Sequence, residues 1–283
     1  MNHLNSQQSK LPVGMFDSGV GGLTVLKALR ERMPCEEILY LGDTARLPYG
    51  TKSAHTVTRY ALQATVKLVE RGVKMLVIAC NTASSVAVDA VRRANPGLPV
   101  IGVVRPGAQA ACRASKSGVI AVVATEGTIA GGAYHRAIHA LRPEALILGR
   151  ATPLFVALAE EGWVEGEITE GVAARYLMPI FDPPSGSDRP SVPDTLVLGC
   201  THFPLLAGAI RNVIGPDVAI VDSAATAADA IQAELRDSGQ TNGRDGCGGT
   251  LFLTTDDASK FARTGTMFLG TPIAEQDVEL VDL

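Results

Sequence analysis

The alternation of short apolar runs with longer segments of helical period is the feature that most constrains this chain. The runs are rich in Val, Ile and Leu and lack polar alternation, as is typical of strands buried on both faces of a parallel sheet. Strands that alternate with helices predict an α/β fold, with mainly parallel sheets flanked by helices. The predicted strands span residues 13–16, 37–41, 75–79, 100–103, 119–123, 146–148, 196–198, 218–221 and 251–253.

Segments with helical spacing of apolar residues lie between these runs. We expect helices over residues 23–32, 54–71, 84–94, 131–141 and 203–213, and helix N-caps at Asp222-Ser223 and Thr255-Asp256. Residues 181–193 and 237–249 are rich in loop-forming residues and predict long surface loops. Neither is expected to be a domain linker, because strand-like runs resume after each.

Length and charge narrow the class of protein. A chain of 283 residues with 46% hydrophobic residues can bury a large core, and its length suggests roughly two domains. The net charge is −4 and the 25 Lys and Arg residues are scattered, which argues against a nucleic acid or a membrane surface as partner. The polar start does not resemble a signal peptide, and no apolar stretch approaches the ~20 residues that span a bilayer. We therefore expect a cytoplasmic protein.

Polar side chains follow several predicted strands at the point where each strand ends. Open parallel sheets bind their ligands outside the carboxyl ends of the strands, so these turns are the candidate site. The glycines of DSGVGG, which begins at residue 17, let the backbone approach a ligand, but the spacing fits neither a dinucleotide fingerprint nor a P-loop. The turns contribute Asp17, Ser18, Asp43, Tyr49, Gly50, Cys80, Asn81, Thr82, Thr125, Thr128, Cys200, Thr201 and His202.

Two of these turns match each other. LVIACNTAS (76–84) and LVLGCTHFP (196–204) each carry an apolar strand into a cysteine and then into hydrogen-bonding side chains. A free cysteine is usually just a small buried residue, and we accept that interpretation for Cys35, Cys112 and Cys247. For Cys80 and Cys200 the position at the strand end indicates function. A helix after each could lower the pKa of the thiol.

Two matched thiols suit a limited set of reactions. They could be a nucleophile with its resolving cysteine, or an acid and a base on opposite sides of one carbon. Inverting a stereocentre by deprotonation requires a base on one face and an acid on the other, and similar groups make the reaction reversible. Matched halves that each supply one thiol favour this second arrangement.

Other chemistries are less well supported. A cysteine phosphatase needs an arginine six residues after its nucleophile, where this chain has Val86 and Leu206. No lysine lies in a strand-end turn to form a Schiff base with pyridoxal phosphate. His135 and His139 have helical i, i+4 spacing but no third metal ligand, and the odd number of cysteines without CxxC does not indicate a zinc ribbon or a disulfide framework. We expect neither a metal nor a cofactor.

The ordered motifs FDSGVGGL, YLGDTARLPYG, IACNTAS, VVATEGTI, PLFVALAEEG and LGCTHFPLL make the chain resemble the glutamate racemases of the aspartate/glutamate racemase family, from about residue 13 to 270. These are cofactor-independent isomerases that supply D-glutamate for peptidoglycan. The resemblance implies that Cys80 handles the proton of the D-enantiomer and Cys200 that of the L-enantiomer. It places Asp17 near Cys80, and His202 and Glu160 near Cys200, as assisting groups.

The resemblance also implies a substrate site and a domain arrangement. Two α/β domains would face each other across a cleft, the first formed by residues 1–104 and 215–283 and the second by 105–214. Asp43 matches a family acid whose role stays open, and a homodimer is also left open. Racemisation of aspartate or a hydantoin-like substrate, and a non-catalytic amino-acid binding module, are the alternatives. The implied substrate-binding residues are Asp17, Ser18, Tyr49, Gly50, Asn81, Thr82, Thr125, Thr201 and His202.

Overall fold

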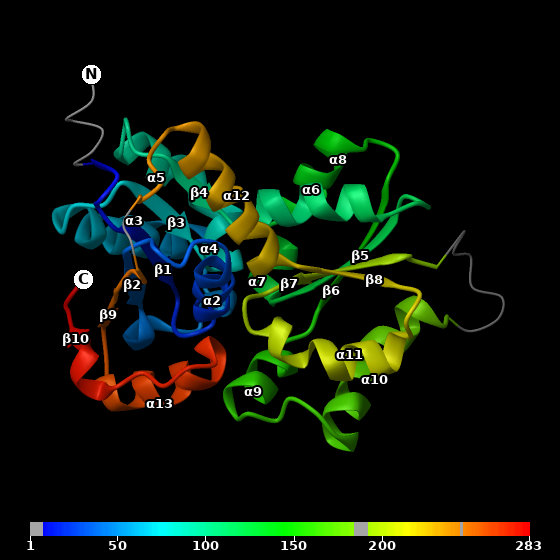
Figure 1. The fold of residues 1–283 in the computed structure, drawn as a ribbon. Helices are drawn as coiled ribbons and strands as arrows, with labels where there is room; N and C mark the ends of the chain where they lie inside the picture. Colours follow the sequence, from blue (N-terminus) through cyan, green and yellow to red (C-terminus); the bar gives the residue numbers. More distant parts are fainter. Residues whose placement is uncertain (1–7, 184–191, 244–245) are drawn as a thin grey trace.

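The strands of this chain form two separate parallel sheets. The computed structural model describes residues 8–183, 192–243 and 246–283, and its helices cover both sheets (Figure 1). The first sheet contains, in order across it, β10 (Val278–Leu280), β9 (Thr250–Thr254), β2 (Ile38–Gly42), β1 (Val13–Asp17), β3 (Met75–Ile78) and β4 (Val100–Gly102). The second contains β6 (Leu146–Ala151), β5 (Val119–Ala124), β7 (Thr195–Gly199) and β8 (Ala219–Asp222). The predicted α/β class is confirmed.

Helices pack on both faces of each sheet because successive strand residues point to opposite sides. Met15 and Phe16 of β1 enter different apolar clusters, and so do Val122 and Val123 of β5. On the first sheet the two faces are covered by α2 (Leu23–Arg32), α12 (Ser223–Asp237) and α13 (Ala258–Leu269), and by α3 (Ala54–Glu70), α4 (Asn81–Val86) and α5 (Val88–Ala94). On the second they are covered by α6 (Val104–Ala114) and α8 (Ala133–Leu141), and by α9 (Leu154–Glu160), α10 (Glu167–Phe181) and α11 (Ala207–Ile214).

The chain crosses between the sheets twice. It leaves the first sheet after β4 through α6, and it returns after β8 through α12, which packs against both α2 and α6. The predicted boundary at residue 214 precedes β8, which pairs with β7 in the second sheet. The domain division stays a prediction, and we propose that the second domain extends through Asp222.

Every predicted strand is present, and the structure adds β10. The expected helix over 84–94 is instead two helices that meet at Ala87. Just before this point the hydroxyl of Ser85 bonds to the carbonyl of Asn81 in the preceding turn, and that of Ser84 to the carbonyl of Ile78 at the end of β3. Asp222 caps α12 as expected, by accepting from the amide of Ala224 at 2.7 Å. The cap predicted at Thr255-Asp256 is wrong, because Asp257 caps α13.

The other departures lie at helix starts and loops. The expected helix over 203–213 begins as the 3-10 turn η3 (Phe203–Leu206), where a proline at the second position cannot donate a backbone hydrogen bond. Much of the predicted loop over 181–193 lies outside the described residues, as do residues 244–245 of the second loop. No helix in the described part of the chain is long and apolar enough to cross a membrane.

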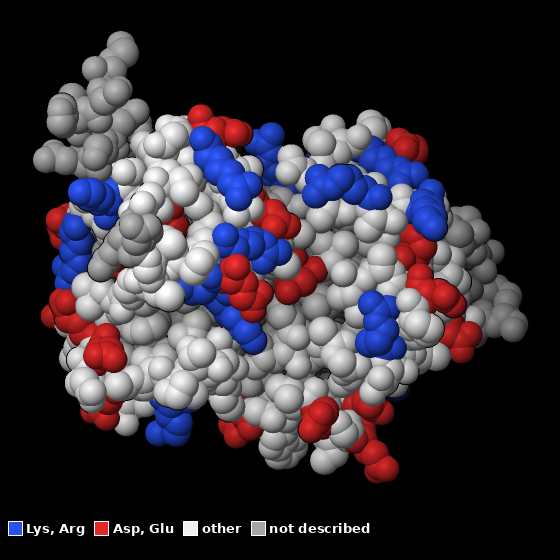
Figure 2. All heavy atoms as spheres, in the orientation of Figure 1, with Lys and Arg blue, Asp and Glu red and all other residues white. Residues whose placement is uncertain are grey.

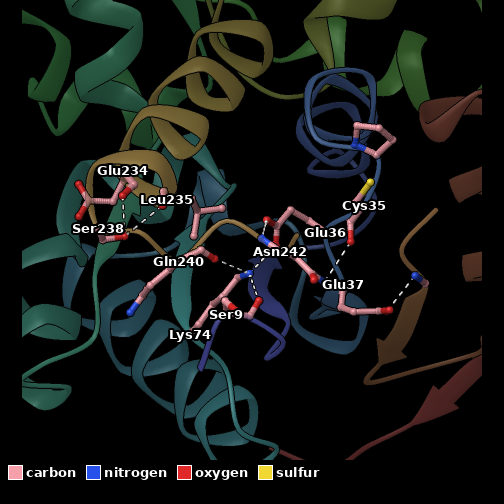
Figure 3. A network of polar contacts seen from close by, with 12 residues as sticks. Ser9, Cys35, Glu36, Glu37, Lys74, Glu234, Leu235, Ser238, Gln240 and Asn242 are labelled. Atoms are coloured by element: carbon pink, nitrogen blue, oxygen red, sulfur yellow. Dashed lines mark hydrogen bonds and ion pairs between the residues drawn. The ribbon is translucent and has the colours of Figure 1, made fainter. Parts of the chain in front are cut away.

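Lys74 forms a buried ion pair at the end of the first sheet away from the polar turns. Its ammonium group pairs with Glu36 and also donates to the carbonyls of Ser9 at 2.7 Å and Gln240 at 2.9 Å (Figure 3). The other oxygen of Glu36 accepts from the amide of Asn242 at 2.7 Å. Burial lowers the pKa of Lys74, and Glu36 opposes this effect. The pair therefore fastens the segment after α12 and the start of the chain to the first sheet.

On the molecular face shown in Figure 2, Lys and Arg side chains are interspersed with Asp and Glu. Side chains of both signs occur over the part of this face formed by the first sheet and its helices and over the part formed by the second. Such a surface does not focus a strong field of one sign.

Asp194 supports the turn that leads into β5. Its carboxylate accepts from the amides of Lys116 and Ser117 at 2.8 and 2.7 Å, and from the hydroxyls of Ser115 and Thr195 at 2.7 and 3.0 Å. Burial acts to raise the pKa of Asp194, but these hydrogen bonds outweigh it and lower the pKa to about 2. The stabilisation is therefore present above pH 3.8, the ordinary pKa, and is lost as the pH falls towards 2.

We expect Asp194→Asn to lower the free energy of unfolding by about 1–3 kcal/mol at neutral pH, because donors of the turn lose a charged acceptor. The difference in the free energy of unfolding between the two proteins should shrink as the pH falls and the carboxylate of Asp194 becomes protonated. Urea unfolding of both proteins between about pH 7 and pH 3 measures this difference. A deficit that stays constant over that range would contradict the assigned role of the charge.

Candidate active site

The carboxyl ends of the two sheets enclose a small cavity. Its walls are the turns after β1, β2, β3, β5 and β7, together with α9. The cavity is narrow, with a volume of about 40 Å³, which excludes a polymer. The parts of the wall come from both sheets, so a ligand here touches both halves of the chain.

The structure gathers almost all the predicted site residues around this cavity. Asp17, Asp43 and Thr128 are the exceptions: all three are buried but do not line the cavity. Gly19, Leu47, Pro48 and Val156 also line the cavity and were not among the predicted site residues. The predicted residues that line it are Ser18, Tyr49, Gly50, Cys80, Asn81, Thr82, Thr125, Glu160, Cys200, Thr201 and His202.

Cys80 lies on the wall contributed by the first sheet. It is the N-cap of α4, its sulfur accepts from the amide of Ala83 at 3.5 Å, and its Sγ lies 3.6 Å from the hydroxyl of Ser18. Burial raises the pKa of Cys80 to about 12, and the nearby charge of Asp17 acts in the same direction. The expectation that the following helix lowers this pKa overall is therefore wrong. The amide does favour the thiolate, but desolvation outweighs it.

Cys200 lies on the opposing wall, in a different polar setting. Its sulfur is 3.7 Å from Nδ1 of His202, whose Nε2 is 3.1 Å from Oε1 of Glu160. Burial acts to lower the pKa of His202, but Cys200 and Glu160 outweigh it and raise this pKa to about 10. The hydrogen bond from His202 lowers the pKa of Glu160. Cys200 therefore faces a protonated imidazole.

Asp17 is buried behind the cavity wall and interacts electrostatically with both Cys80 and His202. Its Oδ2 accepts from the amide of Gly19 at 2.9 Å, and within the described structure its buried Oδ1 has no hydrogen-bond partner. Burial raises the pKa of Asp17, while the charge of His202 and backbone amides oppose the shift. Asp17 thus acts on both thiol environments through the electrostatic field.

Asp43 holds the segment that carries Tyr49 and Gly50 to the cavity. Its carboxylate accepts from the phenol of Tyr49, from Nε of Arg46 at 2.6 Å and from the hydroxyl of Thr255 at 2.9 Å. A charge-assisted acceptor that binds three donors fixes their relative positions. Asp43 therefore supports the wall without reaching the cavity.

Apart from the carboxamide of Asn81, the remaining polar side chains of the site are hydroxyls. Those of Thr82, Thr125 and Thr128 lie 3.0 to 3.2 Å apart and join α4 to the turn after β5. Within the described part of the chain, no lysine or arginine lines the cavity. A negatively charged ligand would therefore be held by O–H and N–H donors and by the protonated imidazole of His202.

The other cysteines and the histidine pair lie away from this site. Cys35 and Cys112 are half-buried and Cys247 is exposed, and none of them lines the cavity. His135 is half-buried on α8, and His139 is exposed and bonds to the carbonyl of Pro143. Among the described residues, no three His, Cys, Asp or Glu side chains are grouped to hold a metal ion.

Comparison with known proteins adds to this geometry. A family model for Asp/Glu/hydantoin racemase matches residues 24–231. Glutamate racemase from Geobacter metallireducens is 45% identical over 93% of this chain and 94% of its own. Two solved structures, each covering 97% of this chain and 98% of their own, are also similar. They are glutamate racemase from Francisella tularensis in complex with D-glutamate, with 36% identity and a TM-score of 0.87, and isoform RacE1 from Bacillus anthracis, with 34% identity and a TM-score of 0.88.

Two buried thiols on opposing walls of one cavity, in a two-sheet α/β chain with these relatives, define an isomerase, an amino-acid racemase. The chain belongs to the Asp/Glu/hydantoin racemase family.

Proposed function

We propose that this protein is a glutamate racemase that interconverts L- and D-glutamate without a cofactor. The observation that carries the proposal is that Cys80 and Cys200, from different sheets, line the same small cavity. The relatives named above, glutamate racemases that match over nearly their full length, support glutamate as the substrate. We further propose that the D-glutamate formed supplies peptidoglycan synthesis.

The different settings of the two thiols support a direction of proton transfer. In the proposed reaction on L-glutamate, Cys200 acts in its thiolate form beside the protonated imidazole of His202 and removes the Cα proton. Cys80, held as a neutral thiol by burial, then donates its proton to the opposite face of the carbanion. One S–H bond forms and one breaks, and the reverse reaction uses the same groups with exchanged roles.

The enclosed site favours formation of the carbanion. A narrow cavity holds little water, so its dipoles act on the developing charge in a low-dielectric surrounding. We propose that Thr82, Thr125 and Asn81 hold one end of the substrate and that Ser18 and Thr201 act near its other polar groups. Asp43 would act indirectly by fixing Tyr49.

The direct test is a polarimetric assay of the purified protein with L-glutamate, without an added cofactor, beside an identical assay with L-aspartate. We expect racemisation of L-glutamate and a much lower kcat/KM for L-aspartate. A preference for L-aspartate would assign the same thiol pair to a different acidic substrate. Binding of glutamate without any exchange of the Cα proton in heavy water would instead support a binding module.

A further inference from the structure

Tyr134 is a buried tyrosine of α8 that lies behind the cavity and touches both thiol-bearing turns. Its side chain is 2% exposed, and it does not line the cavity. The hydroxyl donates to Oδ1 of Asn81, the residue after Cys80, at 2.8 Å. The ring packs on the backbone of Gly199, the residue before Cys200, where an added Cβ would lie 3.0 Å from Cε2 of the tyrosine.

The hydroxyl belongs to a cluster of three polar groups. Nδ2 of Asn81 donates to the hydroxyl of Ser223 at 3.3 Å, and Ser223 lies close enough to the phenol of Tyr134 to act on its pKa. Burial raises the pKa of Tyr134, so the phenol keeps its proton and remains a donor. All three groups are buried, and removing one leaves a partner unsatisfied.

The same side chain also lies beside both chain crossings. Ser223 begins α12, through which the chain returns from the second sheet. Gly107 lies in α6, through which the chain enters the second sheet, and an added Cβ there would be 3.2 Å from the phenol oxygen of Tyr134. Two crossings and two catalytic turns therefore meet at one phenol.

We propose that Tyr134 is a positioning residue that sets the spacing between the Cys80 and Cys200 turns. This inference rests on the proposed two-thiol reaction. The hydroxyl fixes the turn of Cys80 through Asn81, while the ring supports the turn of Cys200 through Gly199. Loss of the hydroxyl alone should therefore displace the Cys80 side and leave the Cys200 side in place.

Tyr134→Phe removes the oxygen and keeps the ring. We expect kcat/KM to fall about tenfold in both directions, with the chain still folded by circular dichroism. The step at Cys80 should become the slow one. The primary isotope effect of α-deuterated D-glutamate should then rise above the wild-type value, and that of α-deuterated L-glutamate should fall.

Tyr176→Phe is the matched control, since Tyr176 is a half-buried phenol of α10 that packs on Phe155 outside the cavity. It should leave rates and isotope effects unchanged. Ser223→Ala removes the other partner of the Asn81 side chain and should shift the isotope effects in the same direction, which keeps the test valid if Tyr134→Phe does not fold.

If the wild-type protein racemises glutamate and the Tyr134→Phe rates lie within twofold of wild type, this inference is overturned and the proposed function is not. A rate loss with equal changes in both isotope effects would also overturn it, because a general structural defect is not directional. Absence of racemisation in the wild-type protein would overturn the proposed function instead.

Discussion

Cys80→Ser and Cys200→Ser are each expected to lower the rate of glutamate racemisation by about 10²–10⁴-fold, the usual contribution of a general acid or base. A hydroxyl is a far weaker acid than a thiol. A serine at either position therefore cannot remove the Cα proton, or donate one to Cα, at the normal rate in the buried cavity. Both cysteine residues are at most 6% exposed, and serine is close to cysteine in size, so the fold should persist. Rates in both directions, followed by polarimetry, measure the effect.

Cys112→Ser is the matched control for this pair. Cys112 is a half-buried free cysteine of α6 whose sulfur lies near the carbonyl of Ile138, away from the cavity. This variant should keep the wild-type rate. A single variant, Cys80→Ser or Cys200→Ser, with full activity would show that one thiol suffices and would remove the two-thiol reaction.

Gly21→Ala has the second largest expected effect. Gly21 lies in the turn after β1, and an added Cβ would contact the ring of His202 and come within 2.5 Å of the hydroxyl of Thr201. Real Cβ atoms do not come that close. Either the imidazole must shift, or the two sheets must move apart. A shift of about 1 Å in a catalytic group can cost about 10²-fold, and we expect kcat to fall by that order.

Gly171→Ala is a suitable control because Gly171 lies in α10 with nothing within 4 Å of an added Cβ. It should leave kcat unchanged and stabilise the helix by about 0.5–1 kcal/mol. Wild-type kcat in Gly21→Ala would mean that the contact between the two halves at His202 does not matter for catalysis. The thermal midpoint of each variant separates a rate effect from unfolding.

Much of the fold could be predicted because it depends on local patterns. Runs such as 119–123 are apolar throughout, which is the signature of a strand covered on both faces. The candidate site followed from the same pattern, since polar residues at the carboxyl ends of parallel strands gather at one edge. This is why Ser18, Cys80, Thr125 and Cys200 lie around one cavity.

What could not be predicted depends on contacts between distant segments. Nothing near Tyr134 in the sequence indicates that its hydroxyl bonds to a residue 53 positions away. Asp43 looked like another strand-end acid, yet it holds Tyr49 and Thr255 and does not reach the cavity. The raised pKa of Cys80 was likewise unexpected, because desolvation depends on burial by the whole fold and only the helix was visible locally.

The two halves also differ more than their matching motifs suggest. Cys80 is followed by a helix and has Ser18 and Asp17 near it, whereas Cys200 is followed by a 3-10 turn and faces His202. The proposed reaction gives the two thiols opposite roles at its start, and their different surroundings fit that assignment.

Racemisation of L-glutamate in heavy water, stopped within the first few per cent of conversion, tests the opposed-thiol arrangement most directly. The D-glutamate formed should carry deuterium at Cα, and the remaining L-glutamate should keep its proton, because the group that takes the proton is not the group that returns one. D-glutamate that retains the original Cα proton would show that one residue carries it from face to face, and this result would contradict the account.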